Sequence, residues 1–204
     1  MPVDVSVILT ELAPMLNAAS VADSDFLFWT QAELYQLADD TIKELARKTL
    51  CFATAPPPIA LAALPAATAL PAGTIAVIYA AFNSVGLRDS NVPELEALDD
   101  NWDAAEGTPK RWVEDLGLAS MRLYPNPPSA GSLALIVQAF PAAISNTQTL
   151  VEAPAPFAGF LLEAIIGRAR AKQGDAMQPE VAEHCAQRAA MYEGIFAQYW
   201  GGGE

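Results

Sequence analysis

From Gly86 to Pro141 the chain reads GLRDSNVPELEALDDNWDAAEGTPKRWVEDLGLASMRLYPNPPSAGSLALIVQAFP. Short apolar runs in this stretch, such as LALIV, are bounded by Pro, Gly or Asp. That pattern is typical of small antiparallel strands joined by tight turns. Long helical patterns flank the stretch on both sides. We therefore expect an α-helical frame that carries a β-rich segment, and nothing in that segment looks catalytic.

Four segments of this region are predicted to form one small sheet. They are residues 74–82, 111–114, 119–124 and 132–140. Their links are too short for crossover connections, which favours antiparallel pairing. Residues 87–98 indicate a strand or turn followed by a short helical turn. The Ala- and Pro-rich residues 53–73 fit either an extended polyproline-like linker or a loose β-excursion, and a surface loop without chemistry is the simplest interpretation.

The flanking helices are predicted from apolar residues that recur with helical spacing. They cover residues 4–19, 30–50, 157–173 and 179–200, and residues 146–156 form a connector. Asp4 is a candidate N-cap of the first helix, which Pro14 is expected to kink or shorten. Thr30 and Glu33 have the spacing of a capping box at the start of the second helix.

The last two helices differ in how much of their surface is apolar. Residues 157–173 are apolar nearly all round, which predicts a central helix packed on several sides. The last helix begins at Pro179, a residue suited to a first helical turn. It is expected to bury one face, made of Val181, Cys185, Arg188 or Ala189, Tyr192, Phe196 and Tyr199.

The predicted fold class is therefore α+β, mainly α: a helical bundle of about four helices with a small antiparallel β insert. Residues 1–50 would supply the N-terminal helices of the bundle and residues 51–145 the β-rich insert. Residues 146–200 would supply the C-terminal helices, and residues 201–204 a flexible tail.

Composition limits the possible partners of the chain. The formal net charge over 204 residues is −13, which disfavours tight wrapping on nucleic acid, because phosphate binding needs Lys and Arg. The same charge would suit a passage through which DNA slides without adhering. Two cysteines, Cys51 and Cys185, indicate small buried side chains rather than a disulfide framework. Prolines divide the uncharged run at 49–87 into pieces too short to span a bilayer, so we expect a soluble protein.

Candidate catalytic and metal-binding motifs are weak. His184 and Cys185 are adjacent on a helix and point about 100° apart, so they cannot form a nucleophile pair. Residues 99–103 resemble the start of a calcium loop, but Ala104 and Lys110 stand where Gly and Glu are required, which favours capping and turn formation. The basic clusters at Lys110–Arg111 and 168–172 are interpreted as solvated ends of helices or strands. We expect no enzyme activity, no cofactor and no metal.

The order of these signals along the chain resembles the head–tail adaptor (head-completion, or connector) proteins of tailed bacteriophages. The matching pieces are Trp29-Thr30-Gln31-Ala32-Glu33-Leu34-Tyr35, Gly86-Leu87-Arg88, Pro93–Leu98, Trp102, Gly107-Thr108-Pro109, Leu123–Pro128, Gly131-Ser132-Leu133, Ala139-Phe140-Pro141, Phe157–Lys172 and Ala186–Tyr199. Residues 53–73 are blander than the corresponding part of such proteins.

This resemblance implies a structural protein of the virion. Such adaptors form rings, usually of twelve copies, beneath the portal protein after DNA packaging. They lengthen the DNA channel and present a platform for the stopper or the tail nozzle. The expected partners are thus the portal protein, the stopper or tail protein, further copies of this chain, and genome DNA passing through without sequence-specific binding. The resemblance implies the head–tail junction as location, assembly in the host cytoplasm, and no membrane partner.

The C-terminal residues are the candidate portal-binding site. Tyr199 and Trp200 precede Gly201, Gly202, Gly203 and Glu204, an arrangement in which aromatic side chains next to a mobile tail act as an anchor. The alternative is that both aromatic residues close the core. Two other functions remain open: a tail-tube or tail-completion component, and a small acidic carboxylate hydrolase or ligand-binding domain.

Overall fold

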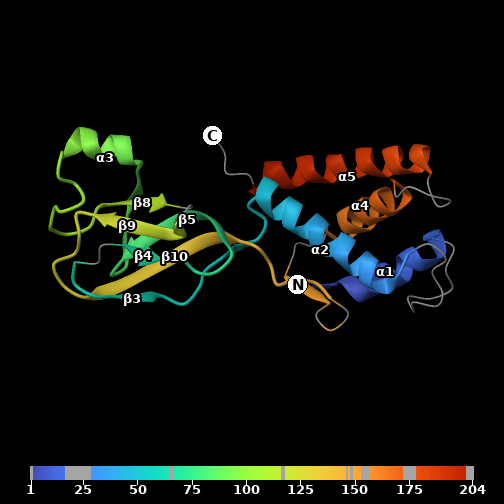
Figure 1. The fold of residues 1–204 in the computed structure, drawn as a ribbon, viewed down its shortest axis with the longest axis horizontal. Helices are drawn as coiled ribbons and strands as arrows, with labels where there is room; N and C mark the ends of the chain where they lie inside the picture. Colours follow the sequence, from blue (N-terminus) through green and yellow to red (C-terminus); the bar gives the residue numbers. More distant parts are fainter. Residues whose placement is uncertain are drawn as a thin grey trace. The chain divides into compact units, whose positions relative to one another are not determined.

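The computed structural model describes residues 2–16, 29–64, 67–115, 118–145, 147, 149–152, 157–171 and 178–200. These residues form five α-helices, one 3-10 helix and eleven strands in three sheets (Figure 1). The chain divides into two compact units, a helical unit (Met1–Phe52 with Pro141–Glu204) and a β unit (Ala53–Phe140). The expected fold class, a mainly α bundle with a small β insert, is therefore wrong, because the β structure is extensive and spread over three sheets.

The helical unit contains most of the helices. Its elements are β1 (Pro2–Asp4), α1 (Val5–Leu12), the 3-10 helix η1 (Ala13–Leu16), α2 (Gln31–Lys48), β11 (Leu150–Glu152), α4 (Phe157–Ala171) and α5 (Pro179–Trp200). Strands β1 and β11 pair antiparallel, Val3 opposite Val151. The strand β11 lies inside the segment predicted to be a plain connector. A three-residue strand is too short to show an alternating pattern, and its partner is at the other end of the chain.

The predicted helix starts are confirmed. The side chain of Asp4 accepts a hydrogen bond from the N–H of Ser6 (2.9 Å) and caps α1. The α-helical part ends at Leu12, two residues before Pro14, and continues as η1 to Leu16. At α2 the N–H of Thr30 donates to the Glu33 carboxylate (2.8 Å), while the N–H of Glu33 donates to Thr30 Oγ1 (3.2 Å). This is the predicted capping box.

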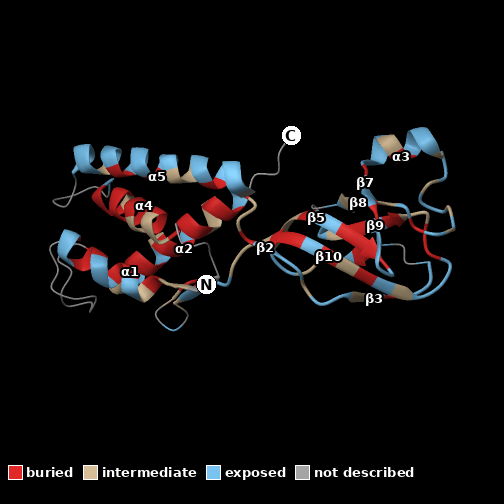
Figure 2. Cartoon of the chain, turned by 180° about the vertical axis from the view of Figure 1, so that it is seen from behind, coloured by how far each residue is buried: buried red, intermediate tan, exposed pale blue. Residues whose placement is uncertain are grey.

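Helix α4 is the central helix of this unit, as its all-round apolar sequence predicted. It contacts α1, α2 and α5, and Figure 2 shows it buried along most of its length. Four phenylalanine rings form a continuous row through the core: Phe52 lies 5.7 Å from Phe157, Phe157 lies 6.0 Å from Phe160, and Phe160 lies 5.8 Å from Phe196. The first and last of these contacts are edge-to-face and the middle one is tilted; such aromatic pairs add to the hydrophobic stabilisation.

The β unit is built from two sheets and one short helix. One sheet holds β2 (Ala53–Thr54), β3 (Ile59–Leu61), β5 (Thr74–Phe82), β6 (Val85–Gly86) and β10 (Gly131–Ala139); the other holds β4 (Thr68–Ala69), β7 (Arg88–Asp89), β8 (Arg111–Asp115) and β9 (Ser120–Tyr124); helix α3 is Val92–Leu98. The strand orders are β2-β10-β5-β6, with β3 also on β10, and β4-β9-β8-β7.

The strands were predicted well, but their pairing was not. The bounds of β5 agree with the expected 74–82, and those of β8, β9 and β10 agree within a residue. However, β10 joins β5 in one sheet while β8 and β9 pair in the other, so the prediction of a single sheet is wrong. The pairing of β7 with β8 is parallel, so the sheet is not purely antiparallel either. The two sheets share one core, which includes Leu135 and Trp112.

The Ala- and Pro-rich segment at 53–73 forms strands, as the β-excursion interpretation expected, so the simpler interpretation as a surface loop is wrong. It supplies β2 and β3 to one sheet and β4 to the other. The pairing of β2 with β10 sets Ala53 opposite Gln138 and Thr54 opposite Val137. The first and last strands of the β unit therefore lie side by side.

The tip of β10 requires a glycine. A Cβ atom on Gly131 would lie 2.3 Å from the Phe82 ring, far inside contact distance. The turn between β5 and β6 is held by Asn83, whose side-chain oxygen accepts a hydrogen bond from the N–H of Ser132 (2.9 Å). This hairpin therefore depends on contacts with β10 as well as on its own turn residues.

A carboxylate joins the two sheets. Glu114 on β8 accepts a hydrogen bond from the N–H of Val77 on β5 (3.0 Å). Burial raises the pKa of Glu114, the Val77 N–H opposes this shift, and the charge of Asp89 adds to it. The pKa of Glu114 is therefore higher in the folded protein than its ordinary value of 4.5. The protonated carboxyl group contributes stability that is fully present below pH 4.5. This contribution is lost as the pH rises through the pKa of the folded protein.

The variant Glu114→Gln is therefore expected to match the wild type near pH 4 and to exceed its free energy of unfolding near pH 7. The amide oxygen still accepts from Val77, but no charge is buried. Urea unfolding at both pH values measures the difference. Asp115→Asn, an exposed neighbour, is the control. Lower stability of Glu114→Gln at pH 7 would contradict the prediction.

Among the described helices, none is both long and apolar enough to cross a membrane.

Candidate assembly interface

A groove of about 520 Å³ opens between three helices of the helical unit. It is lined by Thr41 and Lys48 of α2, by Phe160, Ala164, Gly167, Arg168 and Ala171 of α4, and by Ala182, Glu183, Ala186, Ala189, Ala190 and Glu193 of α5. The lining is mostly apolar. Because alanine and glycine side chains are short, they leave room for larger side chains from outside.

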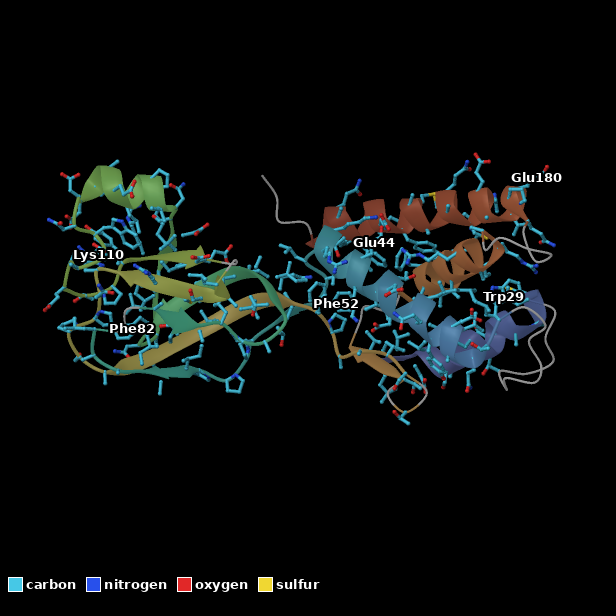
Figure 3. All side chains as sticks on the ribbon, viewed as in Figure 1. Trp29, Glu44, Phe52, Phe82, Lys110 and Glu180 are labelled. Carbon is cyan, nitrogen blue, oxygen red and sulfur yellow. The ribbon has the colours of Figure 1, made fainter. Side chains whose placement is uncertain are left out.

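Four charged side chains fix the rim of the groove and tie the three helices together. Lys48 Nζ lies 2.7 Å from Glu44 and 3.0 Å from Glu193, and Arg168 donates to Glu44. Figure 3 shows Glu44 on α2 where that helix approaches α5. The hydrogen bond from Lys48 and the charges of Lys48 and Arg168 lower the pKa of Glu44, and the bond to Glu44 raises the pKa of Lys48. Both groups are therefore charged at neutral pH.

Helix α5 also carries exposed apolar side chains outside the groove. Met191 is 65% exposed, Ile195 38% and Tyr199 78%. Their spacing of four residues places them along one side of the helix. Figure 2 shows α5 exposed along most of its length. These three side chains are the candidate contact surface of the described part of α5.

The predicted buried face of α5 is partly wrong. Cys185, Ala189 and Phe196 are buried, whereas Val181 and Tyr199 are exposed. The predicted positions mix steps of three and four residues, and at about 100° per residue they stay within an arc of about 80°. Val181 and Tyr199 therefore share the direction of the buried residues but are exposed at the two ends of the helix. The exposed pair Met191 and Ile195 was missed, although its spacing was visible in the sequence.

The predicted portal-binding residues lie at the end of α5. Tyr199 projects from the last turn and is exposed, so it does not close the core of this chain. Trp200 is the last residue of α5. Its side chain and residues Gly201, Gly202, Gly203 and Glu204 lie outside the described structure. The assignment of these residues to a portal contact stays a prediction.

The basic cluster at the end of α4 is not the solvated helix end that was predicted. Arg170 is only 7% exposed, donates to the backbone oxygen of Met15, and lies over the Trp29 ring at 5.7 Å. Arg168 contacts Glu44 in the rim of the groove. Both arginines therefore hold helices together. Residue 172, the third member of the cluster, lies outside the described residues.

The other sequence motifs have structural roles. His184 is exposed while its neighbour Cys185 is buried, and burial and the Glu163 carboxylate raise the pKa of that thiol. Asp99 terminates α3 and accepts a hydrogen bond from the N–H of Asn101 (3.0 Å), which confirms the capping and turn interpretation. Within the described ranges, no group of three or more His, Cys, Asp or Glu side chains could hold a metal ion.

Comparison with known proteins identifies the family of the chain. No curated protein matches it. The sequence profile of the SU10 adaptor protein family matches residues 4–202, which include both units. A match of that extent agrees with the resemblance to bacteriophage adaptors. The chain therefore belongs to the SU10 adaptor protein family, whose members are structural proteins of the phage virion.

Proposed function

We propose that the protein is a head–tail connector adaptor. It assembles as a ring of twelve copies on the portal protein once DNA is packaged, extends the DNA channel, and offers the stopper or tail nozzle a platform for attachment. Its site in the virion is the neck, and it is made and assembled in the host cytoplasm. The family match over residues 4–202 is the observation that carries this proposal.

Two properties of the chain support the same function. A row of exposed apolar side chains on α5 provides a surface for partners. The net charge of −13 repels the phosphate backbone, so that DNA passes a ring of such subunits without adhering. In this arrangement the helical segments 1–50 and 146–200 pack side by side around the ring, and the β-rich segment 51–145 lies at one rim.

Electron microscopy tests the proposal directly. The protein is mixed with tail-less, DNA-filled capsids of its own phage, and the vertex is reconstructed. A new ring of density below the portal is the expected result and gives the copy number. Bare portals together with decorated tails would instead make the protein a tail component. Failure to bind either would overturn a role at the head–tail junction.

The portal contact is proposed to use Tyr199, Trp200 and Gly201–Glu204. Deleting residues 198–204 is expected to abolish binding to the portal while the fold persists, because Phe196 is the last buried residue of α5 that the structure describes. Binding is measured by co-sedimentation with capsids, and folding by circular dichroism. Gln187→Ala, at another exposed site of α5, is the control. Unchanged binding by the truncated chain would contradict this assignment.

A further inference from the structure

We propose that neighbouring copies in the ring are joined by a head-to-tail contact, in which Met191 and Ile195 of one copy enter the α2–α4–α5 groove of the next. This inference rests on the proposed function and specifies which residues meet. Both halves of the contact belong to the helical unit.

The two halves lie on opposite sides of one helix. An α-helix turns by about 100° per residue about its axis. Viewed along the axis of α5, the mean direction of Ala182, Ala186 and Ala190 is therefore roughly 160° from that of Met191 and Ile195. The first set lines the groove, and the second set is exposed outside it. Each subunit thus has a projection on one side and a recess on the other, so the same contact can repeat from copy to copy. The chain of copies closes into a ring when the rotation between neighbouring subunits allows it.

The dimensions of the groove suit such a projection. Its volume of about 520 Å³ accommodates several large side chains. Along α5 the wall from Ala182 to Ala190 is about 12 Å long, and the projection from Met191 to Ile195 is about 6 Å long. The short alanine side chains let a second helix approach closely.

Charges next to the two surfaces are complementary. Beside the projection, Arg188 is half exposed and lies 3.0 Å from Glu163. At the groove, the two cations in the lining, Lys48 and Arg168, already contact acids of the same chain. Glu183 contributes a further carboxylate to the lining. The groove and its rim thus hold three carboxylates, Glu44, Glu183 and Glu193, against two cations. Arg188 is paired with Glu163, but half of its side chain is exposed, so its remaining N–H donors can meet the excess acid, which favours another copy of this chain as the occupant.

Disulfide trapping tests the contact in solution, without capsids. The full chain with Ile195→Cys and Ala186→Cys is oxidised and resolved by size under denaturing conditions. A head-to-tail contact predicts a ladder of dimers, trimers and larger species, because each copy offers one cysteine to each neighbour. The single variant Ile195→Cys should give only the wild-type background set by Cys51 and Cys185. Dimers that form from this single variant would show a symmetric contact and overturn the proposal, as would a double variant that forms no ladder.

Three charge variants of the helical unit then connect the contact to assembly on capsids. Ile195→Glu and Ala186→Glu should each weaken ring formation about tenfold or more, since each buries an unpaired carboxylate. Thr10→Glu adds the same charge at an exposed site on α1, away from the groove and the projection, and should assemble as the wild type does. Full rings from Ile195→Glu would overturn the inference while leaving the adaptor function intact. A ladder in solution, with no wild-type ring on capsids, would instead remove the proposed function and retain the contact.

Discussion

Replacing Phe160 with alanine is expected to lower the free energy of unfolding by about 3–5 kcal/mol. Phe160 is 1% exposed and lies at the centre of the phenylalanine row, with Phe157 on one side and Phe196 on the other. Removing its ring leaves a cavity between α4 and α5 and breaks two ring contacts. The protein then loses both the free energy gained by burying the ring and the favourable contacts that the ring makes with its neighbours.

Urea unfolding followed by helical circular dichroism measures this loss. Tyr199→Ala removes a ring of similar size from an exposed position and should change stability by no more than about 0.5 kcal/mol. Phe160→Leu keeps part of the volume and should lie between the two. A loss below about 1 kcal/mol in Phe160→Ala would show that the helices close the cavity without penalty.

Replacing Asp39 with alanine is expected to cost about 2–3 kcal/mol. Asp39 lies on α2 and is 6% exposed. One carboxylate oxygen accepts a hydrogen bond from the buried N–H of Ile144 (2.9 Å), and the other pairs with Lys43. Alanine removes a charge-assisted bond and leaves the Ile144 N–H buried without its acceptor, which is the larger part of the cost.

The neighbouring residue supplies a matched control. Asp40 is exposed and accepts a hydrogen bond from the Gln36 side chain, so Asp40→Ala should change the free energy of unfolding by less than about 0.5 kcal/mol. Asp39→Asn retains an oxygen acceptor for Ile144 and should recover part of the loss. Equal effects of Asp39→Ala and Asp40→Ala would mean that the Ile144 contact contributes little.

Elements defined by local sequence could be predicted, and those defined by distant partners could not. Helix α2 was predicted because Thr30 and Glu33 are three residues apart and its apolar stripe repeats within the helix itself. Strand β5 was predicted because β-branched and aromatic residues are concentrated there. The division of the strands into two sheets depends on pairs such as Val77 with Val137, which no local pattern encodes.

The same limit applies to the candidate interface. The candidate tail residue Tyr199 could be found because aromatic residues before a glycine tail stand out in the sequence. The groove could not, because its lining is mostly small residues of three helices that meet only when folded. Arg170 was assigned to solvent because charged residues are mostly exposed; the carbonyl of Met15 and the Trp29 ring that bury it come from distant parts of the chain.

The pairing of β2 with β10 has an evolutionary consequence. Because Thr54 lies opposite Val137, the chain departs into the β unit and returns from it at neighbouring points. Domains whose ends are adjacent can be exchanged as cassettes, since a replacement need only span the same short gap. The β unit can therefore diverge in length and sequence while the helices that carry the groove keep their packing.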